Sequence, residues 1–133
     1  GFLVDFLPSS RPFIIKQVQV VGMSRGTVAV WNKDMKPVYE STYASKAGTA
    51  PWWEIDIPNV EVNDKFYVHF FAPYGIMSAD NSTANQHSYM TENISGTFKI
   101  RYEWYYSFPG GSYIDQRNVN WMIRVYGTYG STK

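Results

Sequence analysis

The aromatic residues are the side chains of this sequence best suited to binding chemistry. Tyrosine and tryptophan offer an apolar ring face with a polar tip, which is how proteins hold sugar rings and protein partners. Trp52 falls on the polar face of a predicted strand. A stretch rich in tyrosine and glycine carries four more candidates, namely Tyr105, Tyr106, Phe108 and Tyr113. These five residues are predicted to bind a protein partner or a cell-surface glycan.

The two histidines are the candidates for acid–base chemistry. His87 lies in a polar segment next to Ser88, whereas His69 lies inside an apolar run, where a packed and hydrogen-bonded histidine is expected. A serine hydrolase needs a base, an orienting group and an oxyanion hole, and the sequence has neither Gly-x-Ser-x-Gly nor another nucleophile motif. We therefore predict no catalytic residue and keep His87 as a candidate ligand-binding residue.

Two carboxylates, Glu54 and Asp56, lie on one face of a predicted strand. Glycoside hydrolysis uses two carboxyl groups about 5 to 10 Å apart, one of them with a raised pKa, and a spacing of two along a strand falls roughly in that range. Half-exposed strands commonly carry such outward pairs, so a solvated face is the preferred interpretation. Lys99, Arg101 and Glu103 are expected to be the cross-strand partners of these carboxylates.

Oxygen-rich turns could bind calcium, and the candidates are Asp80 and Asn81, or else Asn63 and Asp64. The EF-hand pattern is absent, and without cysteine or a His-x-x-x-His pair the sequence has no transition-metal motif. We therefore predict no cofactor, with calcium as the alternative. Two Asn-x-Ser/Thr sequons make Asn81 and Asn93 candidate glycosylation sites.

The composition excludes several classes of protein. Only 2 of the 133 residues are leucine, whereas 24 are aromatic and 21 are valine or isoleucine. Because β-branched and aromatic side chains suit sheets, a helical bundle is excluded. The balance of 12 Lys plus Arg against 11 Asp plus Glu argues against a nucleic-acid binder. No apolar run reaches the roughly 18 residues of a spanning helix, so no membrane span is predicted.

Period-two alternation predicts strands that turn one face to a core. Such segments recur roughly every 10 to 15 residues, with turn residues between them. Residues 66–71 are apolar at nearly every position, which predicts a central strand covered on both faces. The predicted fold is all-β, a single two-layer antiparallel sandwich over residues 1–133 with about eight strands, either jelly-roll or immunoglobulin-like. The strands are expected near residues 14–20, 27–31, 38–43, 53–57, 66–71, 87–90, 98–104 and 119–126.

Several local features are expected within this sandwich. Pro58 and Asn59 are expected to form a turn after the strand at residues 53–57. In the polar segment 73–96, residues 75–78 are expected to pair with residues 88–91 and leave residues 79–87 as an exposed tip. The tryptophans expected to fill the core are Trp31, Trp53, Trp104 and Trp121.

One group of segments has a familiar pattern, comprising residues 12–18, 28–32, 53–60, 66–70, 88–89 and 120–127. They resemble β-sandwich domains of surface-exposed and secreted proteins of archaea and bacteria, which are often appended to peptidases, transport components or adhesins. Together with the absent catalytic motif, the resemblance implies a non-catalytic, extracellular accessory or interaction module of a larger protein. A carbohydrate-binding module that uses the loop aromatic residues is the alternative, and a small hydrolase comes third. No signal peptide is present in this sequence, so an exported protein would carry its signal or anchor elsewhere.

Overall fold

The computed structural model describes residues 1–22, 25–72, 79–80, 88–94, 96–101, 105–108, 111–114 and 120–130. Within these ranges the chain forms fourteen strands and no helix, and no helix there is long and apolar enough to cross a membrane. The strands are β1 (Phe2–Phe6), β2 (Phe13–Val20), β3 (Arg25–Trp31), β4 (Pro37–Ala44), β5 (Lys46–Ala47), β6 (Trp53–Val62), β7 (Phe66–Phe71), β8 (Ala79–Asp80), β9 (Ser88–Ile94), β10 (Thr97–Arg101), β11 (Tyr105–Phe108), β12 (Gly111–Ile114), β13 (Asn120–Trp121) and β14 (Ile123–Tyr129).

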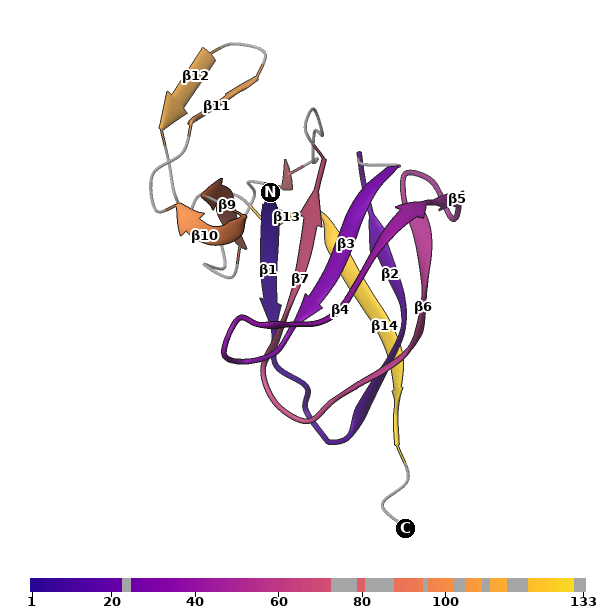
Figure 1. Ribbon diagram of the computed structural model, residues 1–133. Helices are drawn as coiled ribbons and strands as arrows, with labels where there is room; N and C mark the ends of the chain where they lie inside the picture. Colours follow the sequence, from indigo (N-terminus) through magenta and orange to yellow (C-terminus); the bar gives the residue numbers. More distant parts are fainter. Residues whose placement is uncertain are drawn as a thin grey trace.

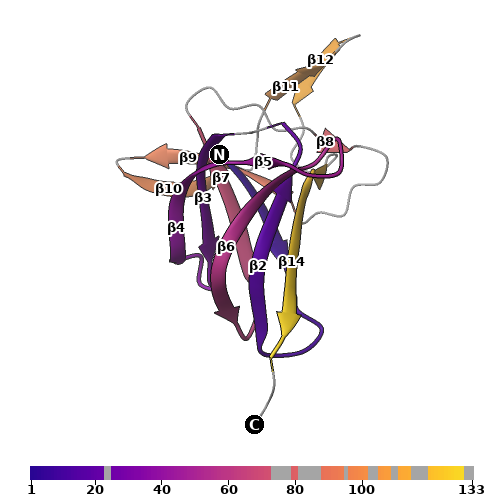
Figure 2. The ribbon, with the colours of Figure 1, turned by 90° about the vertical axis from the view of Figure 1, so that its right-hand side faces the viewer.

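Ten of these strands form two antiparallel sheets that pack face to face (Figures 1 and 2). The larger sheet has the order β10-β9-β1-β7-β3-β4, and the smaller sheet has the order β14-β2-β6-β5. The predicted all-β, two-layer antiparallel sandwich is therefore confirmed. The two sheets already hold more strands than the eight or so expected, and two short pairs, β11-β12 and β13-β8, add four more.

The strands are connected as a long hairpin that is folded over on itself. β3 pairs with β4, β2 pairs with β6, and β1 pairs with β7, all antiparallel. β14 then adds to the other side of β2. This nested pairing is the connectivity of a jelly roll. In an immunoglobulin-like sandwich, the strand that follows β7 in the sequence would pair with β7 at the place that β1 occupies here.

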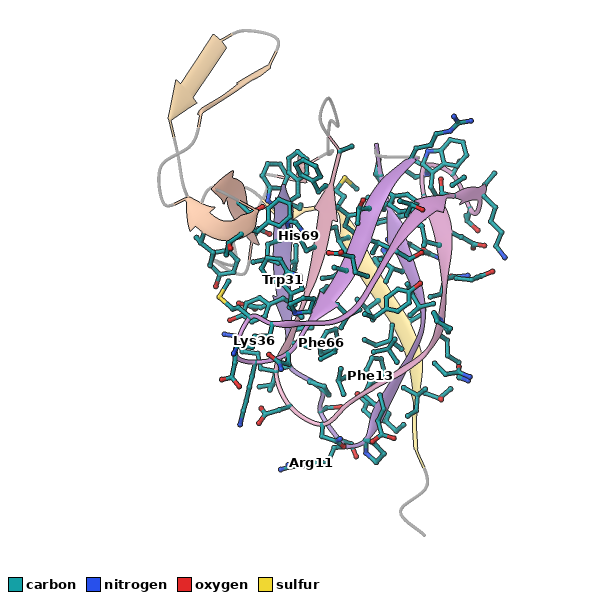
Figure 3. The ribbon with its side chains drawn as sticks, viewed as in Figure 1. Arg11, Phe13, Trp31, Lys36, Phe66 and His69 are labelled. Carbon is teal, nitrogen blue, oxygen red and sulfur yellow. The ribbon has the colours of Figure 1, made fainter. Side chains whose placement is uncertain are left out.

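The main core lies between the two sheets and is built from alternate residues of each. Phe13 and Phe66, which come from opposite sheets, stack with ring centroids 6.2 Å apart (Figure 3). Trp121 closes one end of the core edge-on against Phe2, at 4.9 Å between ring centroids. The aliphatic residues of this core include Ile15, Val18, Val20, Val28, Val30, Ile55, Ile57 and Val68.

A second buried cluster covers the outer face of the larger sheet, and we call it the outer cluster. Its buried members are Leu3, Ala29, Trp31 and Tyr67, with Phe98 and Ile100 of β10 and Tyr89 of β9 packed against them. β7 therefore has the main core on one face and the outer cluster on the other. The sequence-based prediction of a central strand covered on both faces is confirmed.

The tryptophans do not all fill the main core. Trp121 does, but Trp31 is buried in the outer cluster. Trp53 is 37% exposed, because it begins β6 at the rim of the sandwich, where alternation alone does not guarantee burial. Trp104 lies outside the described residues.

Pro58 and Asn59 lie inside β6 and not at a turn. The register between β2 and β6 shifts opposite them, which marks a β-bulge, and bulges are among the places in a sheet where proline is tolerated. Asn59 has a φ of 52° and accepts a hydrogen bond from Lys16 Nζ at 3.1 Å. The expected turn is therefore wrong, and the strand runs on to Val62.

The partners of β9 and β10 differ from the expected ones. β9 pairs with β1 and β10 in the larger sheet, whereas the expected partner at residues 75–78 lies outside the described residues. β10 belongs to the larger sheet and β6 to the smaller one. The expected pairing of Lys99 and Arg101 with Glu54 and Asp56 is therefore wrong, and Glu103 lies outside the described residues.

Candidate functional site

The outer face of the smaller sheet carries polar side chains on three adjacent strands. Successive side chains of a strand point to opposite faces, so the valines of β2 and the isoleucines of β6 fill the core while their polar neighbours lie outside. In the sheet register, Arg124 pairs with Gln19, and Gln19 pairs with Glu54. We use the name polar face for Gln17, Gln19, Glu54, Asp56 and Arg124.

Hydrogen bonds connect the side chains of the polar face into one network. Gln19 Nε2 donates to Gln17 Oε1 at 3.0 Å and to Glu54 Oε2 at 3.4 Å. Gln17 Nε2 donates to Asp56 Oδ1 at 3.3 Å. Asp56 also forms an ion pair with Lys46 of β5, with Nζ and Oδ2 2.9 Å apart. Because Gln17 both accepts and donates, the orientation of its amide is fixed by its neighbours.

The ion pair between Lys46 and Asp56 shifts the pKa values of both groups toward their charged forms. Hydrogen bonds from Lys46 and then Gln17 hold the pKa of the Asp56 carboxyl below its ordinary value. The same contact raises the pKa of Lys46. Both groups are therefore charged at neutral pH. A catalytic acid needs the opposite shift, a raised carboxyl pKa.

Trp52 is the predicted ligand-binding residue whose side chain the structure describes. It is half-buried directly before β6, and the guanidinium carbon of Arg124 lies 3.7 Å from its ring centroid. This is a cation–π contact, and it forms although β2 separates the two strands. Trp52 thus joins the end of the polar face, with Arg124 stacked on its ring.

A pocket of about 290 Å³ opens where the edge of the smaller sheet meets β4 of the larger sheet, and we call it the edge pocket. Its wall from the smaller sheet includes Lys46 and Asp56, the ion pair described above, so pocket and polar face form one continuous surface. Its lining residues are Val28, Tyr39, Ser41, Thr42, Tyr43, Ala44, Lys46, Glu54, Ile55 and Asp56.

Tyr43 of the edge pocket is anchored on the main core. Its ring packs edge-on against Phe70 of the main core, with centroids 5.6 Å apart. Burial raises the pKa of its hydroxyl, so this group keeps its proton and can act as a donor.

The four predicted aromatic residues between 105 and 113 lie on a hairpin of their own. β11 pairs with β12, which places Tyr106 opposite Tyr113 in the ladder. The hairpin stands apart from the two sheets (Figures 1 and 2). The structure thus brings these four positions together but does not bring them to Trp52.

The other predicted positions stay predictions. His87 and Asn81 lie outside the described residues. The backbones of Asp80 and Asn93 lie in β8 and β9. In the part of the chain that the structure describes, no group of three or more histidine, aspartate or glutamate side chains is placed to hold a metal ion.

His69 is a packed residue of the outer cluster region, as expected. It is 2% exposed, and its ring stacks on Trp31 with centroids 4.6 Å apart (Figure 3). Its Nε2 forms a hydrogen bond with Thr91 Oγ1 at 2.8 Å. Burial lowers its pKa to about 3, so the ring is neutral at pH 7.

Sequence reasoning missed the basic and amide members of the site, namely Gln17, Gln19, Lys46 and Arg124. The alternation of Gln17 and Gln19 with buried valines does reveal that they face outward. It does not reveal which strands lie on either side of them, because that depends on the jelly-roll connectivity.

No protein-family model, no curated protein and no solved structure matches this chain. The resemblance to sandwich domains of surface-exposed proteins therefore stays a prediction, and function has to be argued from the residues themselves.

Proposed function

We propose that the chain is a non-catalytic binding module of a larger cell-surface or secreted protein, and that the polar face and the edge pocket form its binding surface. The observation that carries this proposal is the hydrogen-bonded network on an open sheet surface. Donors and acceptors that are already held in place lose little side-chain entropy when a partner binds. The extracellular location rests on the sequence resemblance and the two sequons.

The charges of the site favour binding over turnover. Glu54 and Asp56 both line the edge pocket, as a pair of catalytic carboxylates would. However, Asp56 is paired with Lys46 and its pKa is lowered, which does not suit a proton donor. A small hydrolase is therefore the weaker alternative.

A turnover screen combined with a binding screen tests the proposal. We expect no turnover of glycoside, ester or peptide substrates by the wild-type chain, and binding on a glycan array or to a protein partner that Glu54→Gln weakens. Glu61→Gln is the matched control, because Glu61 lies on the same strand but outside the edge pocket. Turnover that Glu54→Gln abolishes would refute a non-catalytic role.

The hairpin of β11 and β12 supports a second candidate, a carbohydrate-binding module that uses its aromatic residues. The supporting observation is that Tyr106 lies opposite Tyr113 on a hairpin that stands apart from the sheets. Glycan binding that Tyr106→Ala and Tyr113→Ala remove, and that Glu54→Gln leaves intact, would select this function over the first.

A further inference from the structure

The edge pocket has the size of a small-ligand site. Its volume of about 290 Å³ is just below the range of roughly 300 to 1,000 Å³ that is usual for pockets that hold small molecules. It therefore suits a ligand of about one sugar ring, and it is too small for a folded peptide or an extended chain.

One wall of the pocket comes from β4, where Tyr39, Ser41 and Tyr43 alternate toward the inner face and each carry a hydroxyl group. A hydroxyl group both donates and accepts hydrogen bonds, as the hydroxyl groups of a sugar do. Ser41 Oγ already donates to the carbonyl of Thr42 at 2.9 Å, which leaves its oxygen to accept. The tyrosine rings add apolar surface for the C–H groups of a ring.

The opposite wall carries one ammonium and two carboxylates, from Lys46, Glu54 and Asp56. Lys46 and Asp56 compensate each other at 2.9 Å. Glu54 adds a further carboxylate, to which Gln19 Nε2 donates at 3.4 Å. An anionic ligand such as a phosphate, sulfate or uronic acid would be repelled by this excess of negative charge. A small amine would be attracted by Glu54 but repelled by Lys46 in the same wall. The hydroxyl groups of β4 therefore decide for a neutral polyol, which can hydrogen-bond to both walls.

From this arrangement we propose that the edge pocket binds one ring of a neutral sugar, with the β4 hydroxyl groups on one side of the ring and Glu54 and Lys46 on the other. The inference rests on the proposed function, because it names the ligand class of the same surface. It differs from the carbohydrate-binding alternative in place, since the residues lie at the sandwich edge and not on the hairpin of β11 and β12.

An NMR titration of the isotopically labelled chain tests this inference. The probes are the methyl glycosides of glucose, galactose, mannose and N-acetylglucosamine, with sulfate and tetramethylammonium as charged probes. We expect at least one neutral glycoside to shift the amide signals of residues 39–46 and 54–56, with a dissociation constant of about 1 mM or weaker, as a few hydrogen bonds allow.

Three conservative variants separate the pocket from its surroundings. Tyr39→Phe and Glu54→Gln keep the shape of the pocket but remove a hydroxyl or a charge, and each should weaken binding about tenfold. Tyr126→Phe is the matched control, because Tyr126 is an exposed tyrosine on β14, at the other edge of the same sheet. It should leave the dissociation constant unchanged.

The other outcomes each decide the question. If no neutral glycoside shifts the pocket signals while a partner still binds the polar face, the inference is wrong and the proposed function stands. Shifts by sulfate or tetramethylammonium alone also overturn it, as do shifts that Tyr106→Ala removes and Tyr39→Phe does not. Hydrolysis of a bound glycoside would leave the sugar site in place and overturn the non-catalytic function.

Discussion

At the scale of single residues, folding strongly changes the titration of His69. It is enclosed by the rings of Trp31 and Phe98, and burial lowers its pKa to about 3. In the unfolded chain this ring is protonated below about pH 6.5. In the folded chain it is protonated only below about pH 3. The contribution of His69 to stability is therefore complete above pH 6.5 and is lost as the pH falls.

We predict that the free energy of unfolding falls by about 1.4 kcal/mol per pH unit between pH 6 and pH 4.5. Urea denaturation at a series of pH values measures this slope. Asp56 and Asp64, whose pKa values are also lowered, add to it only near and below their ordinary value of 3.8. His69→Gln should flatten the slope, and an unchanged slope in that variant would show that other groups cause it.

Asn59 is held in a left-handed conformation, with a φ of 52°. Glycine adopts this region without strain and alanine does not. We predict that Asn59→Ala is about 1 kcal/mol less stable than Asn59→Gly in urea denaturation. Both variants lose the hydrogen bond from Lys16, so the difference between them isolates the backbone. Equal stabilities would show that the bulge relaxes and does not need this conformation.

At the scale of elements, Phe98 gives β10 three ring contacts with the larger sheet. Phe98 lies 4.5 Å from His69, 5.1 Å from Phe71 and 6.5 Å from Trp31, measured between ring centroids. These three rings come from β7 and β3, so Phe98 connects β10 with the centre of the larger sheet.

We predict that Phe98→Ala lowers the free energy of unfolding by about 2 to 3 kcal/mol and speeds amide hydrogen exchange in β9 and β10. Exchange in β2, in the middle of the smaller sheet, should change little, because its buried side chains pack in the main core and not in the outer cluster. Val38→Ala, at a position that is 52% exposed, is the control and should change little. A uniform gain in exchange over both sheets would contradict a separate outer cluster.

The sequence predicts where most strands lie but not which strands pair. Alternation locates β2, β3 and β4 within a residue or two of their bounds, and a continuous apolar run locates β7. It misses β1, because a short strand covered on both faces does not alternate. It also misreads Pro58 and Asn59, since the same residue types form turns and bulges.

The candidate site, too, could be predicted only in part from the sequence. The outward positions of Trp52, Glu54 and Asp56 follow from period two in one segment. Their partners Gln17 and Arg124 lie far away in the sequence and reach the site only through the pairing of β2 with β6 and β14. Local patterns therefore find the carboxylates but not the network that holds them.

At the scale of the whole molecule, the strands of the jelly roll and those of the β11–β12 hairpin belong to separate sheets. Among the described strands, β11 and β12 pair with each other and with no other strand. We predict that replacing residues 105–114 by a short Gly-Ser linker shifts Tm by less than about 4 °C, which corresponds to roughly 1 kcal/mol or less. Thermal unfolding followed by circular dichroism measures this shift. A loss of cooperative unfolding would show that the hairpin belongs to the folded core.

The nested pairing of the jelly roll also sets the order in which the chain can assemble. Ile123 of β14 pairs with Val20 of β2, about a hundred residues away along the chain. Forming such a distant contact first costs the entropy of closing a long loop, and this cost slows folding. Until residues 123–129 have been synthesised, the edge of β2 that β14 covers is open to pairing with other chains. β14 therefore ends the exposure of β2 and becomes the edge of the smaller sheet in its place.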